Sequence, residues 1–363
     1  MILNFILRNI RRIRRIYFVG KKINWKLFFS LYSRNGEYVV LSPSIFHGFV
    51  QNSLEIDILL AAILCKNEKT FSIVRGKNFK KIKQKKIFYS PSALFNYQNK
   101  LNYAEEVAKM VLIMEKNGNQ VFYSHDEILF WENKTHMHKM FDKLSINTPE
   151  TIIFSNMEDF ENSTLEFPCL LKEEHSHASL GLHKLNNKED GMKIISSENF
   201  KSKNDNIIIQ RLLNIKKDLR VIFVGNEIVL NYWRINPSKE WKPTSTSHGS
   251  GVDFIFFPDK WKDHITKTFL KLKLTTGAFD IAWQNDDLDT EPYFLEVSPS
   301  YQPNPPIDVS EKKYNYGEYK KKFMFKNSWD YNYIEILYSI KSKYIELCIE
   351  KKKNYLKTRN YIM

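Results

Sequence analysis

Two carboxylates lie inside short apolar segments in the C-terminal third of the chain. Asp280 interrupts the run at residues 277–283, and Glu296 interrupts the run at residues 293–299. Both runs have the length and composition of buried β-strands. A buried carboxylate is costly unless a cation or hydrogen-bond donors compensate for the lost water. Two acids on neighbouring strands therefore predict a hard-cation site, and Mg²⁺ shared with nucleotide phosphates is a common reason to build one.

Basic side chains precede these acids on other predicted strands. Lys172 ends a strand at residues 167–172, and Arg220 and Arg234 lie in a hairpin predicted to turn at residues 225–226. An ammonium group binds phosphate oxygens as a point charge, whereas a guanidinium binds phosphate or carboxylate through two parallel hydrogen bonds. Solvated strand residues would have the same sequence, so the functional interpretation depends on the order of the neighbouring motifs.

These side chains must be positioned by more than one folded unit. A chain of 363 residues is too long for one ordinary hydrophobic core, so two or three subdomains are expected. The pattern predicts an α/β (α+β) protein. Its expected parts are a basic amphipathic N-terminal segment (1–35), an N-terminal α/β domain (36–125), a subdomain with a lid loop (126–205), a core subdomain with the metal site (206–310) and a C-terminal helical extension (311–363).

Composition narrows the class of protein. Hydrophobic residues make up 43% of the chain, which is typical of a globular protein, and no apolar run is long enough to cross a bilayer. Cys65, Cys169 and Cys348 are widely spaced in apolar sequence, which indicates buried thiols in a cytoplasmic protein. The formal net charge is +14, but the lysines are scattered over the whole length. A nucleic-acid partner is therefore not expected.

The N-terminal residues 1–18 alternate between apolar and basic side chains. Apolar residues recur at helical spacing, and five arginines lie among them: Arg8, Arg11, Arg12, Arg14 and Arg15. Such a helix can lie on the inner face of an anionic membrane as a peripheral contact. A helix docked on the body of the protein or on a second subunit has the same pattern. Both interpretations remain open.

The order and spacing of the motifs resemble the ATP-grasp superfamily over roughly residues 126–306. The pattern is similar to the carboxylate–amine ligases, which include glutathione synthetase, D-alanine–D-alanine ligase and the ligases that add glutamate to ribosomal protein tails. The resemblance implies an ATP-grasp fold after a small α/β domain, with the nucleotide held between two subdomains. It also implies ATP and Mg²⁺ as cofactors, with Mn²⁺ as an alternative ion, and a homodimer as one option for assembly.

The resemblance assigns a role to each matching position of this chain. Nucleotide-binding roles fall on Lys134, Lys172, Ser179, Gly181, Gln210, Arg211, Leu212, Leu213, Asp218 and Asn236. Roles beside the reacting groups fall on Arg220 and Arg234. The implied magnesium ligands are Asp280, Glu296 and Ser298.

One position departs from the family pattern. The family usually has Glu-x-Asn where this chain has Glu296-Val297-Ser298. A serine hydroxyl is a poorer Mg²⁺ ligand than an amide oxygen, and water or the later Asn304 are alternatives for completing the shell. The departure leaves open a weaker second metal site, an altered reaction or a protein without activity.

The sequence is compatible with three functions. The first is an ADP-forming ligase that activates a small-molecule or glycan carboxylate as an acyl phosphate and joins it to an amine, in surface-glycan or peptide modification. The second is a kinase acting on a small molecule or sugar. The third is an ATP-binding scaffold without catalysis. Catalysis in the first case would come from positioning and charge neutralisation around the moving phosphoryl group.

Overall fold

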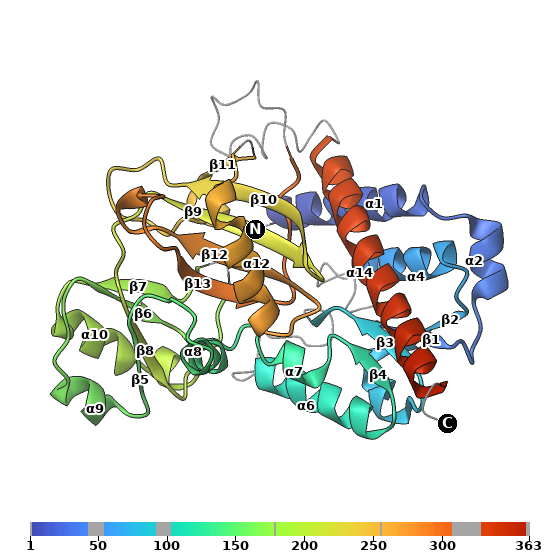
Figure 1. Cartoon of the computed structure of the whole chain (residues 1–363), viewed down its shortest axis with the longest axis horizontal. Coiled ribbons are helices and arrows are strands. Elements are labelled where there is room, and N and C mark those ends of the chain that lie inside the picture. The colour runs from blue at the N-terminus through green and yellow to red at the C-terminus, as the bar shows by residue number, and fades with distance from the viewer. Residues whose placement is uncertain are drawn as a thin grey trace.

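The computed structural model describes residues 2–42, 54–91, 103–177, 179–254, 256–306 and 328–360. Within these ranges the chain forms three β-sheets with helices packed around them (Figure 1). The first sheet is parallel and the other two are antiparallel. The predicted α/β (α+β) class is therefore confirmed.

The first sheet has the strand order β2-β1-β3-β4. Its strands are β1 (Tyr38–Ser42), β2 (Phe71–Arg75), β3 (Lys86–Tyr89) and β4 (Gln120–Phe122). The connecting segments include α4 (Leu54–Lys66), η1 (Gly76–Lys81) and α6 (Tyr103–Lys116). Helix α4 is apolar on nearly all sides because it is buried between the sheet and other helices. Parallel strands require such covered faces.

The second sheet has the strand order β5-β8-β6-β7 and a small core of its own, centred on Phe160. Its strands are β5 (Thr151–Phe154), β6 (Cys169–Lys172), β7 (Leu182–Leu185) and β8 (Ile207–Arg211), with α9 (Met157–Asn162), α10 (Lys188–Ile195) and α11 (Glu198–Lys201). Strand β8 pairs with β5 and β6, so this sheet extends across the boundary expected at residue 205.

The third sheet has the strand order β11-β10-β9-β12-β13. Its strands are β9 (Lys217–Val224), β10 (Glu227–Ile235), β11 (Gly251–Asp253), β12 (Thr276–Ala282) and β13 (Tyr293–Ser298). The predicted hairpin is present, and Gly225 takes a φ of +63° at its turn, a conformation that glycine adopts without steric cost. Every residue of β12 is buried, Asp280 included, in agreement with the mainly apolar sequence of this strand.

Helices α8 (Lys134–Lys143) and α12 (Lys262–Lys271) share one core with this third sheet. Met137 and Phe141 of α8 pack with Phe279 of β12. Helix α8 therefore supports the third sheet, although the sequence pattern placed it in the subdomain of the second. The remaining short helices are α7 (His125–Ile128), η3 (Thr246–His248), η4 (Asp259–Trp261) and η5 (Gln284–Asp286).

Terminal helices complete the molecule: α1 (Ile2–Gly20), α2 (Trp25–Leu31) and the long α14 (Ser328–Asn360). Helix α14 runs across the face of the first sheet beside α4, as Figure 1 shows, and reaches β9. One large core unites the first sheet, α14 and residues of the third sheet such as Ile222 and Tyr232. The predicted C-terminal helix is therefore present, and it joins the N-terminal domain to the third sheet.

Helix α1 is docked on α4 and α14. Arg15 donates to the fully buried Asp330 of α14 at 2.9 Å and lies 3.4 Å from Glu55 of α4, while Arg11 and Arg14 lie within 4 Å of the same Asp330. Arg11, Arg14 and Arg15 thus face the protein, and Ile13 and Tyr17 face solvent. This is the docked alternative for the N-terminal segment. Among the described helices, none is long and apolar enough to cross a membrane.

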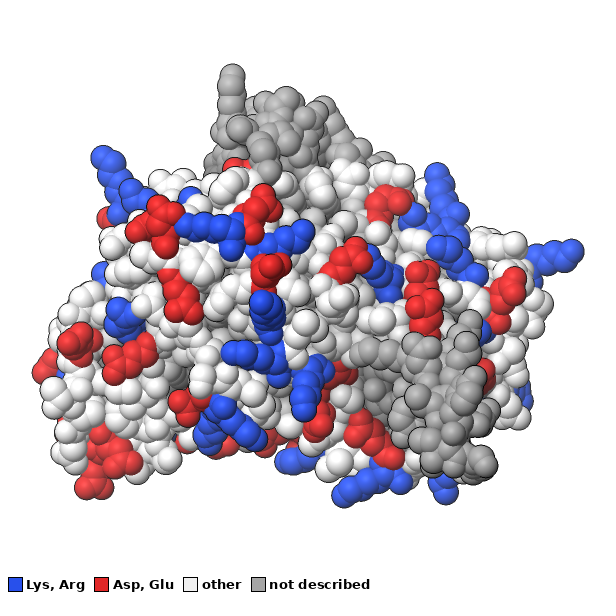
Figure 2. Space-filling view, in the orientation of Figure 1, with Lys and Arg blue, Asp and Glu red and all other residues white. Residues whose placement is uncertain are grey.

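On the face in Figure 2, basic and acidic side chains alternate over the surface. They do not gather into one basic stripe on this face. This distribution agrees with the scattered lysines of the sequence, whose charges are offset locally by nearby acids.

Candidate functional site

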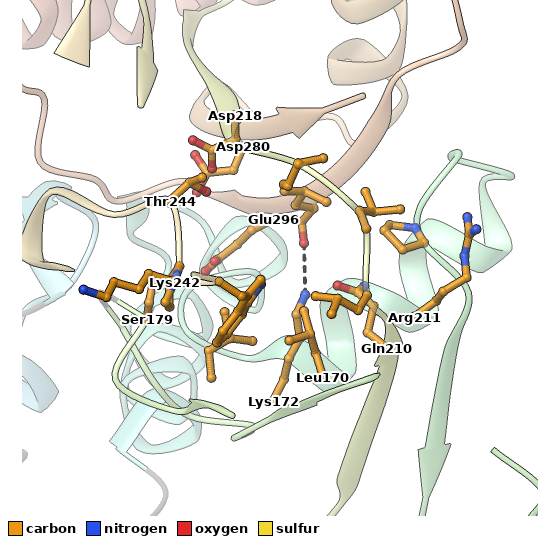
Figure 3. Close-up of a pocket in the computed structure, with 18 of the residues that line it drawn as sticks. Leu170, Lys172, Ser179, Gln210, Arg211, Asp218, Lys242, Thr244, Asp280 and Glu296 are labelled. Carbon is orange, nitrogen blue, oxygen red and sulfur yellow. Dashed lines mark hydrogen bonds between the residues drawn. The ribbon is translucent and has the colours of Figure 1, made fainter. Parts of the chain in front are cut away.

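A cleft lies between the second and third sheets (Figure 3). It is bounded by the ends of β6 and β8 on one side and by β9, β10, β12 and β13 on the other. Predicted residues that line it are Lys172, Ser179, Gln210, Arg211, Leu212, Leu213, Asp218, Arg234, Asp280 and Glu296. Predicted residues that lie outside this lining are Lys134, Gly181, Arg220, Asn236 and Ser298.

Asp280 and Glu296, the two carboxylates predicted to hold a cation, are direct neighbours in the third sheet. Asp280 of β12 pairs with Glu296 of β13 in antiparallel register, and directly opposed residues project from the same face of a sheet. Asp280 also pairs with Arg220 of β9 on its other side. The spacing of the two apolar strands therefore placed both carboxylates correctly at one wall of the cleft.

Two aspartates and two arginines form a buried ionic network at this wall. Arg220 holds Asp280 through two parallel hydrogen bonds of 2.8 Å, from Nε to Oδ1 and from Nη2 to Oδ2. Arg234 donates through Nε to Asp218 at 2.9 Å and places Nη2 2.8 Å from Asp280 Oδ2. Two positive charges therefore balance two negative charges, which offsets part of the cost of burying them.

The two aspartates respond differently to this shared network. Burial disfavours the charged form of both, but Arg220 and Arg234 together outweigh burial at Asp280 and lower its pKa to about 2. Burial dominates at Asp218, whose pKa is raised despite Arg234, and the negative charge of Asp280 adds to the shift. Asp280 is thus the permanently charged carboxylate of the pair.

Lys172 reaches across the cleft from the second sheet. Its Nζ lies 3.4 Å from the carbonyl oxygen of Leu295, next to Glu296, as the dashed line in Figure 3 shows. Burial, together with the nearby Lys134, lowers the pKa of Lys172 to about 8, against an opposing effect of Glu296. A buried ammonium in an open cleft attracts an anion, because an anion restores the charge balance that water would otherwise supply.

Lys134 contacts the part of the chain where the sequence predicts a lid loop, residues 173–177 and 179–181, here called the lid segment. It is the first residue of α8, and its Nζ donates to the carbonyl oxygen of Ser176 at 2.8 Å and to the Ser176 hydroxyl at 2.9 Å. In this arrangement the ammonium group anchors the lid segment. The role in binding phosphates that the resemblance implies for Lys134 remains a prediction.

At the end of the lid segment, the backbone of Gly181 packs too closely against Glu173 to leave room for a side chain. The Glu173 amide donates to the Gly181 carbonyl oxygen at 2.7 Å, and a Cβ added at residue 181 would lie 2.5 Å from the Glu173 Cβ. Only glycine fits this close approach. Ser179 lies between them in the chain and faces the cleft with a positive φ of 59°.

The connection from β8 to β9 forms one end of the cleft. Gln210 donates to Thr151 Oγ1 at 2.9 Å, and Arg211 donates to the Tyr293 hydroxyl at 2.9 Å. Arg211 thereby joins the second sheet to the third, and Leu212 and Leu213 follow it along the lining. This is the position at which the resemblance implies an adenine-binding hinge.

Asn236 holds a loop whose residues were not among the predicted site residues. Its side chain contacts the carbonyl oxygens of Glu240 and Lys242 at 3.3 Å. The cleft is lined by the residues that follow, Trp241 to Thr244, and the Thr244 hydroxyl bonds to Asp218. The sequence marks these residues only by their position shortly after Arg234 and Asn236. A loop has no periodicity that would reveal which of its side chains face inward.

The oxygens that could hold a metal come from few side chains. Within the described residues, no group of three or more His, Cys, Asp or Glu side chains could hold a metal ion. The Ser298 hydroxyl donates to the Ser300 carbonyl oxygen at 2.7 Å, and Asn304 lies beside Tyr232. Asp280 and Glu296 are hard oxygen donors facing one cleft, which fits Mg²⁺ that takes its remaining ligands from phosphates and water.

Comparisons with known proteins identify this architecture. Residues 131–302 match the model of the RimK-like ATP-grasp domain, which confirms the predicted ATP-grasp fold for this part of the chain. D-alanine–D-alanine ligase from Bacillus anthracis complexed with ATP superposes with a TM-score of 0.53 at 12% identity, covering 88% of this chain and 100% of that one. D-cycloserine synthetase DcsG gives a TM-score of 0.51 at 9% identity, covering 83% and 98%. No curated protein matches.

Proposed function

We propose that this chain is an ATP-dependent, ADP-forming ligase that joins a carboxylic acid to an amine. The carboxylate attacks the γ-phosphorus, the bond from that phosphorus to the bridging oxygen breaks, and ADP leaves. The amine then attacks the acyl carbon, loses a proton and displaces phosphate. The observation that carries the proposal is the Asp280–Glu296 pair facing Lys172 across the cleft of an ATP-grasp domain.

Each residue has a task that follows from its contacts. Lys172 binds phosphate oxygens, and Arg234, which lines the cleft, neutralises charge on the moving phosphoryl group. Arg220 is a positioning residue, because it holds Asp280 through both carboxylate oxygens. Mg²⁺ held by Asp280 and Glu296 would neutralise the phosphates, and Mn²⁺ suits the same oxygens. Residues 210–213 lie where the adenine would rest.

The test is release of phosphate from ATP that requires both an acid and an amine. We expect Lys172→Met and Glu296→Gln to lower this rate by at least ~100-fold, because the first removes a positive charge that binds the phosphates and the second removes a carboxylate that would hold Mg²⁺. Lys201→Met, an exposed lysine in α11, is the matched control and should match the wild-type rate. Near-normal turnover in the first two variants would contradict the proposal.

A kinase is the second candidate, since the ligase reaction also begins with transfer of the γ-phosphoryl group to an acceptor. It would yield ADP and a phosphorylated product without free phosphate. Mass spectrometry of the products separates the two reactions in one experiment. An acid panel that includes sugar acids and peptides would show whether the substrate is a glycan or a peptide carboxylate. ATP binding without turnover over the whole panel would favour a scaffold.

A further inference from the structure

A second cavity lies at the other end of the third sheet, against the N-terminal domain. Its walls are the carboxyl ends of β3 and β4, the segment after β13 and one face of α14. Strand β1 pairs with β2 on one side and β3 on the other, so the order of connections reverses between β1 and β3. In open α/β sheets, ligands bind outside the carboxyl ends of the strands near such a reversal, and this cavity lies one strand further along, at the carboxyl ends of β3 and β4.

Lys341 of α14 points into this cavity without a counter-ion. It is 9% exposed, and its Nζ donates to the Tyr123 hydroxyl at 2.7 Å. The ammonium lies 5.3 Å from the ring centre of Tyr123, 5.5 Å from that of Tyr344 and 5.7 Å from that of Tyr301. No aspartate or glutamate is among the cavity's lining residues, and none within the described chain pairs with Lys341.

A buried lysine with only hydroxyl and ring partners is costly, because neither carries a full negative charge. Burial accordingly lowers the pKa of Lys341. The hydroxyl of Tyr344, one helical turn further along α14, is also buried and has no hydrogen-bond partner among the residues that the structure describes. One ammonium and one free hydroxyl match the two oxygens of a carboxylate, and both groups would be satisfied by the same ligand.

The short stretch of chain after β13 links the cleft to this cavity. Ser300 and Tyr301 line it, and Ser300 follows Glu296 by four residues, a separation of at most ~14 Å for extended backbone. The residues that carry it belong to α14, which begins after the ATP-grasp match ends at residue 302. The site therefore adds a feature of this chain's own C-terminal helix to the domain.

We propose that Lys341 and Tyr344 anchor a carboxylate of the small organic acid on which the ATP-grasp site acts. This role in substrate binding rests on the proposed function, whereas carboxylate binding by itself does not. A carboxylate fits better than a phosphate, because the cavity offers a single cation and no arginine among its lining residues.

The test measures binding of propionate, with propionamide and inorganic phosphate as comparison probes at equal ionic strength. We expect propionate to raise the unfolding temperature of the wild-type protein, and propionamide to leave it unchanged. Lys341→Met should lose the response, and Tyr344→Phe should bind propionate roughly tenfold more weakly. Lys343→Met is the matched control, since Lys343 lies on the same helix and pairs with Glu227 at the surface.

Two results would overturn the proposal: an equal propionate response in wild type and Lys341→Met, or a response to phosphate in place of propionate. Because Lys341→Met can fail to fold, the Cε signal of Lys341 in wild-type protein with ¹³C-labelled lysine is a second readout. Propionate should raise the pKa that this signal reports, and an unchanged pKa would also overturn the proposal.

Steady-state kinetics distinguish a failure of the carboxylate site from a failure of the proposed ligase activity. Where turnover is found, Lys341→Met should raise KM for the acid at least tenfold and leave KM for ATP unchanged. Where no acid supports phosphate release, the ligase proposal fails while the propionate result still decides the carboxylate site.

Discussion

Asp280 and Asp218 both contact Arg234, yet the pKa values of their carboxyl groups move in opposite directions. The difference follows from the number of arginines, since Asp280 contacts both Arg220 and Arg234 while Asp218 contacts only Arg234 of the two. Lys172 faces this network from the opposite sheet and has no comparable partner. At the scale of residues, the cleft is therefore balanced on one wall and short of negative charge on the other.

The pKa of Lys172 gives a prediction for stability against pH. Its folded value of about 8 lies below the ordinary 10.5, so between these values the unfolded chain binds a proton that the folded chain has released. Stability should therefore rise with pH from about 8 to 10.5, by at most ~3 kcal/mol from this group. Urea unfolding of wild type and Lys172→Met across this range checks it. Parallel curves for the two proteins would contradict the prediction.

The sequence predicts cleft residues best on β-strands, because the alternation along a strand determines to which face of the sheet each side chain points. Asp280, Glu296 and Arg234 line the cleft, and the sequence singles them out because each interrupts or ends an apolar strand, whereas Arg220 of the same hairpin lies outside the lining. The lining residues Trp241 and Thr244 were missed, because their orientation depends on Asn236 and Asp218 from other elements. Lys341 resembled any lysine on a helix, and only the folded chain shows that it is buried among tyrosines.

At the scale of elements, two segments depend on a single close contact. The lid segment is closed by the bond between Glu173 and Gly181, where no Cβ fits. Helix α1 is held by Asp330, which lies more than three hundred residues away in the chain. Neither contact could be predicted from a local pattern, which is why the arginines of α1 were compatible with a membrane surface as well as with docking.

Gly181→Ala should open the lid segment. The added Cβ overlaps Glu173 and Ser176, and overpacking of this kind costs ~1–3 kcal/mol. Faster hydrogen exchange at the Glu173 amide is the expected result. Gly20→Ala is the control, because a Cβ there would meet Trp25 at an ordinary 3.7 Å. Unchanged exchange in Gly181→Ala would show that the segment does not depend on this contact.

Asp330→Ala should release α1. The substitution leaves three arginines beside a buried site without their shared carboxylate, and breaking a buried ion pair in this way costs ~3–5 kcal/mol. Trypsin should then cleave within α1 much faster, and the urea midpoint should fall. Asp289→Ala removes an exposed partner of Lys260 and should change neither quantity. Equal trypsin rates in both variants would contradict the docking role.

At the scale of the whole molecule, α14 holds two folded units together. Its buried residues belong to the same core as β1, β3 and part of the third sheet. The second sheet has a separate core, and its unit contacts the rest of the molecule both across the cleft and through the bonds of Lys134 to Ser176. Within the described residues, α14 contributes no buried side chain to that separate core.

Truncation tests this role of α14. A chain ending at Glu350 keeps the buried Tyr344, Ile345 and Cys348, so its unfolding temperature should stay close to that of the full chain. A chain ending at Lys343 loses all three, and each apolar side chain of this size contributes ~1.5–3 kcal/mol when buried. The shorter chain should unfold at much lower temperature or aggregate. Similar unfolding temperatures for the two would contradict a structural role for this part of α14.

The ion pair between Arg15 and Asp330 joins residues 315 positions apart, nearly the two ends of the chain. During synthesis at ~5–20 residues per second, the arginines leave the ribosome roughly 15 to 60 seconds before their aspartate exists. For that interval the first sheet also lacks the helix that covers it. The nascent chain therefore presents an open apolar face beside a cluster of positive charge, which is a surface suited to a chaperone until the last helix is made.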